Sequence, residues 1–141
     1  MSKVIIDAKN CILGRLATFA AKRTLMNDEV VIVNCEHAVI SGNRNLTLAK
    51  YRQKCNRGSP TQGPFIPKTA DRMVKRTIRG MIPYKKGRGK EPFNRIRCYR
   101  GIPEDFAKGP FHTIKGASIS KLPRLEYITV GEICNHLKEK K

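Results

Sequence analysis

The chain has 141 residues, which is enough for one ordinary domain with a buried core. Apolar residues make up 40% of it, and this excludes a fully disordered chain. Lys and Arg number 29 against 11 acidic residues, giving a net charge of +18. A domain this basic repels itself unless an anionic partner binds it, so we expect nucleic acid, an anionic membrane surface or a polyacidic protein as that partner.

Membrane and secreted proteins are poor matches to this sequence. It has no run of about 18 apolar residues, and its N-terminal apolar stretch, residues 4–6, is too short for a signal peptide. We therefore expect a cytosolic protein. The five cysteines are odd in number, widely spaced and without zinc-ligand spacing, so we expect buried thiols and neither a metal nor another cofactor.

The first half of the chain alternates strand and helix patterns. Residues 3–7 are a β-branched run typical of a strand, and apolar residues at helical spacing predict a helix over 13–25. Asn27 can end this helix because Asn tolerates the left-handed conformation. Residues 30–33 predict a buried strand and 39–40 a second, short one. This alternation is typical of an α/β domain with parallel strands.

Helix and loop patterns follow in the middle of the chain. Residues 48–55 predict a second helix, and three prolines and two glycines mark 57–68 as a loop. A third helix is predicted over 71–81, a basic loop over 85–90 and a strand over 96–99.

The C-terminal part is expected to be irregular before it ends in a helix. Residues 104–124 are rich in Gly and Pro and predict a surface extension. The pattern Thr129-x-x-Glu132 is a capping box, so the last helix should begin there.

The positive charge is concentrated between Arg44 and Gly101. This segment has 17 Lys/Arg and two acids, a net charge of +15 over 58 residues, whereas the other 83 residues have 12 Lys/Arg and nine acids. A merely solvated surface would intersperse both signs. Binding of a polyanion is therefore the better explanation.

Two neighbouring motifs carry much of this charge. The helix expected over 71–81 presents Val74, Ile78 and Met81 on one face and four cations on the other. Such cations repel one another in isolation but release counterions when they face phosphates. The KKGRGK loop at 85–90 contains glycines that permit close approach to a phosphate chain, and we expect it to become ordered on RNA. Its spacing does not match a nucleotide-binding P-loop.

Two further residues are candidates for contact with RNA. Tyr84 is the aromatic residue best placed in the sequence to stack on an unpaired base, and packing in the core explains it equally well. Arg15 lies at the start of the first helix, where a helix N-terminus can bind an anion. The alternative is close packing of that helix on the sheet.

No catalytic motif accompanies these basic features. Glu36 and His37 are adjacent, but neighbours in an extended strand point to opposite faces, and no nucleophile elbow, HExxH or kinase motif is present. Two alternatives stay open: an enzyme on an α/β scaffold, and a regulatory protein that binds mRNA or another RNA. The second lacks an RNA-recognition aromatic motif, a KH-type loop and a zinc knuckle.

Three parts of the chain resemble the universal large-subunit ribosomal protein family numbered thirteen, in its archaeal and eukaryotic cytosolic form. They are VIIDA, LGRLA, VVIVNCE and ISG between residues 4 and 42, RTIRGMIPYK at 76–85, and YRGIP at 99–103. The bacterial form has His-Pro-His just after the YRG stretch, whereas Ile102-Pro103-Glu104 follows here. This departure argues against a bacterial or organellar ribosome and leaves both an archaeal and a eukaryotic source open. Many relatives have Trp where Lys75 stands and Gly where Asn27 stands.

The resemblance implies a fold and a function. The fold would be a three-layer α/β/α sandwich around a four-stranded, mainly parallel sheet, with basic loops and an irregular C-terminal extension. The function would be that of a structural constituent of the large ribosomal subunit, which binds rRNA during assembly, supports translation and catalyses nothing. Its partners would be large-subunit rRNA and neighbouring ribosomal proteins in the cytoplasm, with no membrane and no small-molecule substrate.

We expect residues 1–141 to form one rRNA-binding domain in which segment 44–101 contacts the RNA. Arg72, Arg76 and Arg79 should bind phosphates with their planar, paired donors. The full set of expected RNA-binding residues is Arg15, Lys50, Lys54, Arg57, Lys68, Arg72, Arg76, Arg79, Tyr84, Lys85, Lys86, Arg88 and Lys90.

Overall fold

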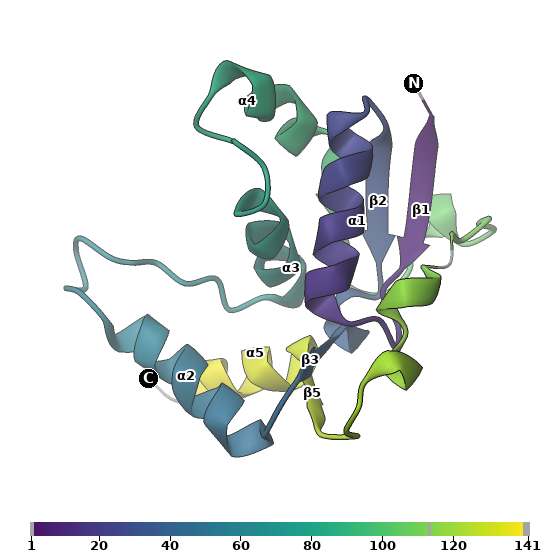
Figure 1. The fold of residues 1–141 in the computed structure, drawn as a ribbon. Helices are drawn as coiled ribbons and strands as arrows, with labels where there is room; N and C mark the ends of the chain where they lie inside the picture. Colours follow the sequence, from purple (N-terminus) through teal and green to yellow (C-terminus); the bar gives the residue numbers. More distant parts are fainter. Residues whose placement is uncertain (1, 113, 140–141) are drawn as a thin grey trace.

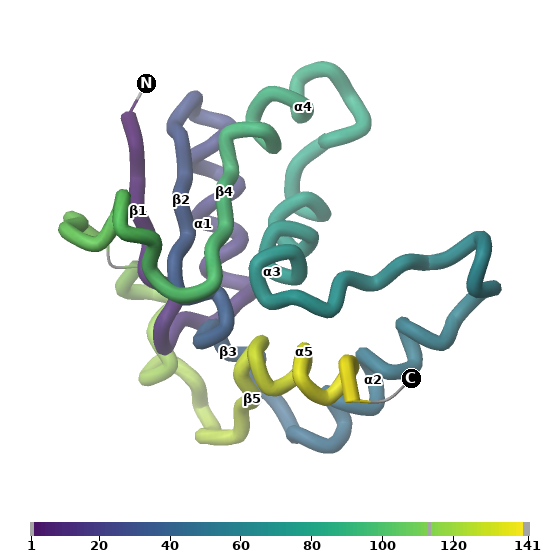
Figure 2. The backbone as a smooth tube through the Cα atoms, turned by 180° about the vertical axis from the view of Figure 1, so that it is seen from behind, coloured from purple at the N-terminus to yellow at the C-terminus, as the bar shows by residue number. Residues whose placement is uncertain are grey.

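The main sheet consists of three parallel strands. The computed structural model describes residues 2–112 and 114–139. In it β1 (Lys3–Asp7), β2 (Glu29–Val33) and β4 (Ile96–Cys98) lie in the order β1-β2-β4. Figure 1 shows β1 and β2 side by side, and Figure 2, from behind, shows all three strands. The expected α/β class with parallel strands is confirmed.

Two helices cover one face of this sheet. α1 (Leu13–Leu25) runs along the strands and α3 (Ala70–Arg79) lies beside it (Figure 1). Alternate strand residues point toward these helices, because successive side chains of a strand point to opposite faces. Ile6, Ile32 and Ile96 are fully buried on this side and form the centre of the apolar core.

The opposite face of the sheet has no covering helix in the part of the chain that the structure describes (Figure 2). Instead, the chain after β4 runs past the end of β2 and along the edge of β1. There the Asn34 N–H donates to the Gly101 carbonyl (2.9 Å) and the His112 N–H to the Ile5 carbonyl (2.7 Å). The structure therefore differs from the expected three-layer sandwich. The expected irregular extension is confirmed, with short 3-10 turns at Glu104–Phe106, Lys115–Ala117 and Ile119–Lys121.

A second, smaller sheet lies at one end of the molecule. β3 (Val39–Ser41) pairs antiparallel with β5 (Tyr127–Thr129). α5 (Val130–Glu139) follows β5 directly and packs against α2 (Arg44–Asn56), as Figure 2 shows.

The expected four-stranded sheet is not found among the described residues. Asn34 adopts a left-handed conformation (φ +57°) directly after β2, and a 3-10 turn, Cys35–His37, follows it. This turn leads the chain away from the parallel sheet. The fourth strand, β3, therefore pairs with a strand near the C-terminus, which no local pattern could indicate.

Predictions about helix ends are partly confirmed. α1 ends at Leu25, and Asn27 has a φ of +69°. At the start of α5 the Thr129 N–H donates to the Glu132 carboxylate (3.1 Å), and the Glu132 N–H donates to the Thr129 hydroxyl (3.2 Å), which is the expected capping box. Met81, expected on the apolar face of the helix with Val74 and Ile78, is 43% exposed. α3 ends at Arg79, so Met81 lies in the turn after the helix and is not held on its buried face.

Four of the six residues of the basic loop expected over 85–90 are helical. α4 (Gly87–Asn94) begins within it. Gly89 is buried, and a Cβ there would lie 2.0 Å from the Pro83 carbonyl oxygen. This glycine therefore permits close packing of α4 on the preceding turn, which corrects its expected role in approaching a phosphate chain.

The cysteines behave largely as apolar residues. Cys11, Cys35 and Cys134 are buried, Cys55 and Cys98 are half-buried, and all five are free thiols. Burial raises the pKa of the Cys11 and Cys134 thiols, and a hydrogen bond with Cys98 together with burial raises that of Cys35. Within residues 2–112 and 114–139, no group of His, Cys, Asp and Glu could hold a metal ion, and no helix is long and apolar enough to cross a membrane.

Candidate nucleic-acid interface

α2 presents three of the expected RNA-binding cations. The helix begins after Asn43, whose side chain accepts the N–H of Asn45 (2.9 Å) and thereby caps the first turn. α2 has no fully buried residue, so most of its circumference faces solvent. Lys50 and Lys54 lie on that surface, and Arg57 directly follows the helix; all three are exposed.

α3 is strongly amphipathic, with one apolar and one basic face. Val74 and Ile78 are fully buried against the core, whereas the cations lie on the other side, as the sequence predicted. Arg76 donates from one guanidinium nitrogen to the Phe65 carbonyl (2.9 Å), which ties the 57–68 loop to the helix. Arg72 remains exposed.

The aromatic neighbours of α3 are covered by its cations. The Arg79 guanidinium lies 4.8 Å from the centre of the Tyr84 ring, so one face of this ring is occupied. Stacking of an RNA base on the other face stays a prediction. The Lys75 ammonium lies 5.0 Å from the centre of the Phe93 ring. Lys75 therefore caps an aromatic side chain of α4.

A hollow between α2 and α3 brings three expected residues together. It has a volume of about 410 Å³ and includes Lys54, Arg57 and Arg76 in its lining, which contains no acidic side chain. Although Lys54 is largely exposed, partial loss of solvent around its ammonium lowers its pKa, and the nearby charges of Lys50, Arg76 and Arg57 lower it further. Cations that converge in this way without a carboxylate are suited to bind an anion.

The cations before and within α4 form a separate exposed group. Lys85 and Lys86 lie in the turn before this helix, and Arg88 and Lys90 lie in its first turn. In Figure 1, α4 projects at the end of the molecule opposite to α2 and α5. The expected RNA-binding residues thus extend along one side of the molecule rather than forming a single cluster.

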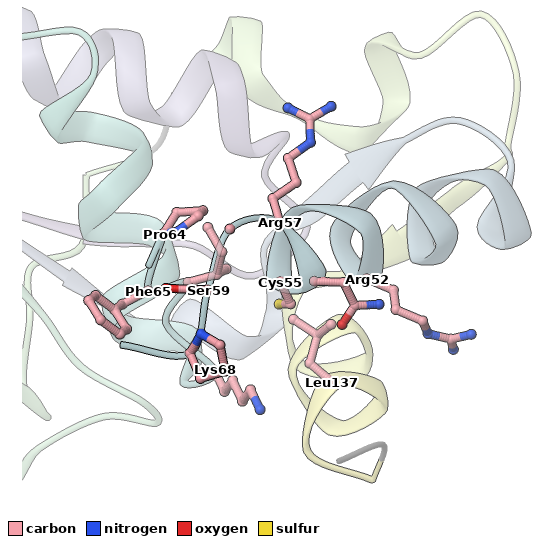
Figure 3. Close-up of a pocket in the computed structure, with 12 residues that line it drawn as sticks. Arg52, Cys55, Arg57, Ser59, Pro64, Phe65, Lys68 and Leu137 are labelled. Carbon is pink, nitrogen blue, oxygen red and sulfur yellow. The ribbon is translucent and has the colours of Figure 1, made fainter. Parts of the chain in front are cut away.

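A second cavity, of about 600 Å³, lies between the end of α2, the 57–68 loop and α5. Figure 3 shows Cys55 and Leu137 on one side of it and Ser59 and Pro64 across from them. Lys68, an expected RNA-binding residue, also lines this cavity.

The structure adds one cation that the sequence analysis did not single out. Arg52 lines the same cavity and contacts the ring of His136 on α5. The charge count of segment 44–101 included Arg52. A helix pattern alone could not show that α5 lies next to it, because that contact joins positions 84 residues apart in sequence.

Arg15 lies apart from the hollow and the second cavity. It is exposed in the first turn of α1, and its guanidinium donates to the Gly116 carbonyl (2.8 Å). This contact holds the irregular C-terminal segment against α1, so part of the donor capacity of Arg15 is already used.

Few of the cations in segment 44–101 are neutralised. Among the described residues, two of these 17 side chains pair with a carboxylate: Arg44 with Glu132 (3.2 Å) and Arg95 with Glu91 (3.3 Å). The others form no ion pair with an acid in that part of the chain. The positive surface is therefore available to a partner.

Glu36 and His37 are closer together than expected. They lie on a 3-10 turn rather than on a strand, and the His37 ring nitrogen is 3.4 Å from the Glu36 carboxylate. The prediction that they point apart is wrong. Both Glu36 carboxylate oxygens accept the N–H of Gly101 (3.2 and 3.0 Å), so this carboxylate fastens the chain after β4 to the end of β2.

Comparison with known proteins gives one consistent result. The family model described as "Ribosomal protein L13" matches residues 2–105. Similar curated proteins are called "Large ribosomal subunit protein uL13". That of Methanosarcina barkeri is 45% identical over 137 residues, and that of Methanococcoides burtonii is 42% identical over 136; each match covers 96% of this chain and 98% of the relative. That of Archaeoglobus fulgidus is 39% identical over 134 residues, covering 94% of this chain and 86% of the relative.

Proposed function

The chain belongs to the ribosomal protein L13 family, and we propose that it binds large-subunit rRNA through its basic segment, residues 44–101. Members of this family are structural components of the large ribosomal subunit, so the chain serves translation and is not an enzyme. The family match and the archaeal relatives place it on the archaeal branch, in a ribosome of the cytoplasm.

The observation that carries the proposal is the row of unpaired cations along α2, α3 and α4. In segment 44–101, two of 17 cations pair with an acid among the described residues. Such a surface gains free energy by displacing the counterions of an RNA backbone. The whole chain then acts as one rRNA-binding domain, and its other sides are left for neighbouring ribosomal proteins.

The proposed contacts divide into three groups. The hollow between α2 and α3 binds the RNA most closely, and the group around α4 reaches a separate part of it. Peripheral contacts with phosphates come from Arg15, Lys50, Lys68, Arg72 and Arg79. Arg and Lys contacts of this kind give affinity and orientation rather than base specificity.

Sedimentation tests the assignment to the ribosome. A tagged protein in a cell lysate should migrate with the large subunit on a sucrose gradient, and should stay with it after EDTA separates the subunits. Recovery mainly at the top of the gradient would contradict the proposal and favour an RNA-binding role away from the ribosome. The RNA bound to that fraction would then be sequenced.

Salt dependence tests the assignment to α3. The double variant Arg76→Ala with Arg79→Ala should bind rRNA more weakly, and its plot of log affinity against log salt should be shallower by roughly 1.4 to 1.8. The matched control is Lys22→Ala with Lys121→Ala, which removes two exposed cations outside segment 44–101. An unchanged slope in the first variant would assign the RNA contacts to another surface.

A further inference from the structure

The hollow between α2 and α3 has two kinds of wall. Lys54 lies on α2, Arg57 directly follows that helix, and Arg76 lies on α3. The loop that joins these helices contributes two prolines and an isoleucine, Pro64, Ile66 and Pro67. A simple phosphate-binding surface would need only the first of these walls.

The cationic wall is arranged for a phosphate before any ligand binds. Arg76 is held by the Phe65 carbonyl through one nitrogen, so its other donors have a fixed direction. Arg57 points away from Cys55 and Leu137 in the neighbouring cavity (Figure 3), and its charge acts on Lys54 in the hollow. Because no acidic side chain lines the hollow, an anion is its complementary ligand.

The apolar wall is arranged for something larger than a phosphate. Ile66 and Pro67 are half-buried and line the hollow, so they offer apolar surface to a ligand in it. The volume of about 410 Å³ lies within the range of roughly 300–1,000 Å³ typical of small-ligand sites. Flat, apolar base faces are the parts of RNA that pack on such surfaces, and they are accessible only where the base is unpaired.

We propose that this hollow receives one unpaired nucleotide of rRNA, with its phosphate on Lys54, Arg57 and Arg76 and its base against Pro64, Ile66 and Pro67. The inference rests on the proposed rRNA-binding function and makes it more specific. A continuous duplex keeps its bases stacked inside, so it could reach the cations but not the apolar wall. The site therefore selects a bulge, a loop or a strand end.

Two RNA hairpins of equal length and charge test this inference with the purified full-length protein. One is fully paired and the other has a single unpaired 2-aminopurine nucleotide. We expect the second to bind about tenfold more tightly and its fluorescence to change on binding. Equal affinities would overturn the inference, whereas failure of both hairpins and of rRNA to bind would overturn the proposed function as well.

A matched pair of variants in the 57–68 loop tests whether the apolar wall of the hollow causes the preference for an unpaired nucleotide. Pro67 lines the hollow, whereas Pro60 lines only the neighbouring cavity. Pro67→Ala should reduce the preference for the unpaired nucleotide at least threefold, and Pro60→Ala should leave it unchanged. Ile66→Ala is a second test should Pro67→Ala unfold the loop, as judged by circular dichroism. A preference that survives both Pro67→Ala and Ile66→Ala would place the unpaired nucleotide elsewhere.

Discussion

Gly89 illustrates how one residue fixes the position of a basic element. It lies in the first turn of α4, close against the backbone of the turn that follows α3. Gly87, two residues earlier, has no neighbour within 4 Å of the place where a Cβ would be. Two glycines that look equivalent in the sequence therefore have different roles, one in packing and one at an open helix start.

Gly89→Ala should destabilise the protein by roughly 1 to 3 kcal/mol, because its Cβ would collide with the Pro83 carbonyl and move α4. Gly87→Ala is the matched control and should be neutral or slightly stabilising, since Ala favours a helix. The measurement is the free energy of unfolding in urea. Equal effects of the two substitutions would contradict the packing role of Gly89.

Lys54 is destabilised by the positive charges that lie close to it. It lies four residues after Lys50 on α2 and near Arg57 and Arg76, and the pKa of its ammonium is lowered, first by burial and then by these charges. A group with a lowered pKa binds its proton less readily in the folded state than in the unfolded chain. The charged Lys54 therefore destabilises the folded state to the full extent at pH values below its pKa in the folded protein. This effect disappears as the pH rises toward 10.5, the ordinary pKa of a lysine.

Lys54→Met should raise the free energy of unfolding of the RNA-free protein by about 0.3 kcal/mol at pH 7, since it removes an i,i+4 repulsion. The same substitution should weaken RNA binding. Lys85→Met, in an exposed turn, is the control and should have no effect on stability. Unfolding in urea at low salt, repeated at rising pH, measures the difference. A Lys54→Met protein less stable than wild type at pH 7 would refute the repulsion.

At the scale of elements, local patterns predicted most helices and strands because their signals are short in range. The apolar spacing of α1 and α3, the β-branched runs of β1 and β2, and the capping box of α5 each lie within one segment. The sequence predicted a loop where α4 lies, because its helix signal is not local. Its glycines and its proline at position 92 disfavour a helix locally, and only packing on the preceding turn stabilises it.

Thr129→Ala should destabilise the protein by about 1 kcal/mol, because it removes the hydroxyl that caps α5. Thr129→Ser keeps the hydroxyl and is the control. Urea unfolding at pH 7 measures both. A loss of stability equal in the two variants would show that the methyl group, and not the cap, is important.

Glu132→Ala should lower the stability of the folded protein by an amount that depends on pH. A hydrogen bond from the Thr129 N–H, and also Arg44, lowers the pKa of Glu132 below 4.5. The carboxylate therefore stabilises the folded state above pH 4.5, and this contribution disappears as the pH falls through the lowered value. The difference in stability between wild type and Glu132→Ala should be largest near neutral pH and vanish in acid. If this difference in stability stayed the same at every pH, the charge of Glu132 would not contribute to the cap.

At the scale of the whole molecule, charge rather than packing sets the solution behaviour. A net charge of +18 on 141 residues repels itself at low ionic strength, and few carboxylates offset it within the basic segment. The protein should therefore become more stable as salt screens this repulsion, with a Debye length that shortens from about 30 Å at 0.01 M to about 10 Å at 0.1 M.

The melting temperature of the RNA-free protein should rise as NaCl increases from about 10 to about 300 mM, because the Debye length shortens over this range. Phosphate at equal ionic strength should raise it further, because it also binds the hollow between α2 and α3. A melting temperature that falls with salt would show that ion pairs, rather than repulsion, dominate the electrostatic contribution to stability.

The sequence alone determined the α/β class, the helix and strand positions in the first half of the chain, the concentration of charge in segment 44–101 and the family resemblance. These are properties of neighbouring residues or of composition, and they do not require knowledge of distant contacts. The sheet topology could not be predicted from local patterns, because β3 pairs with β5, which lies some 90 residues later in the chain. Only the tertiary structure decided that Lys54, Arg57 and Arg76 share one hollow with the apolar side of the 57–68 loop. The reason is that a ligand site is formed by side chains from separate elements, and their convergence depends on how those elements pack.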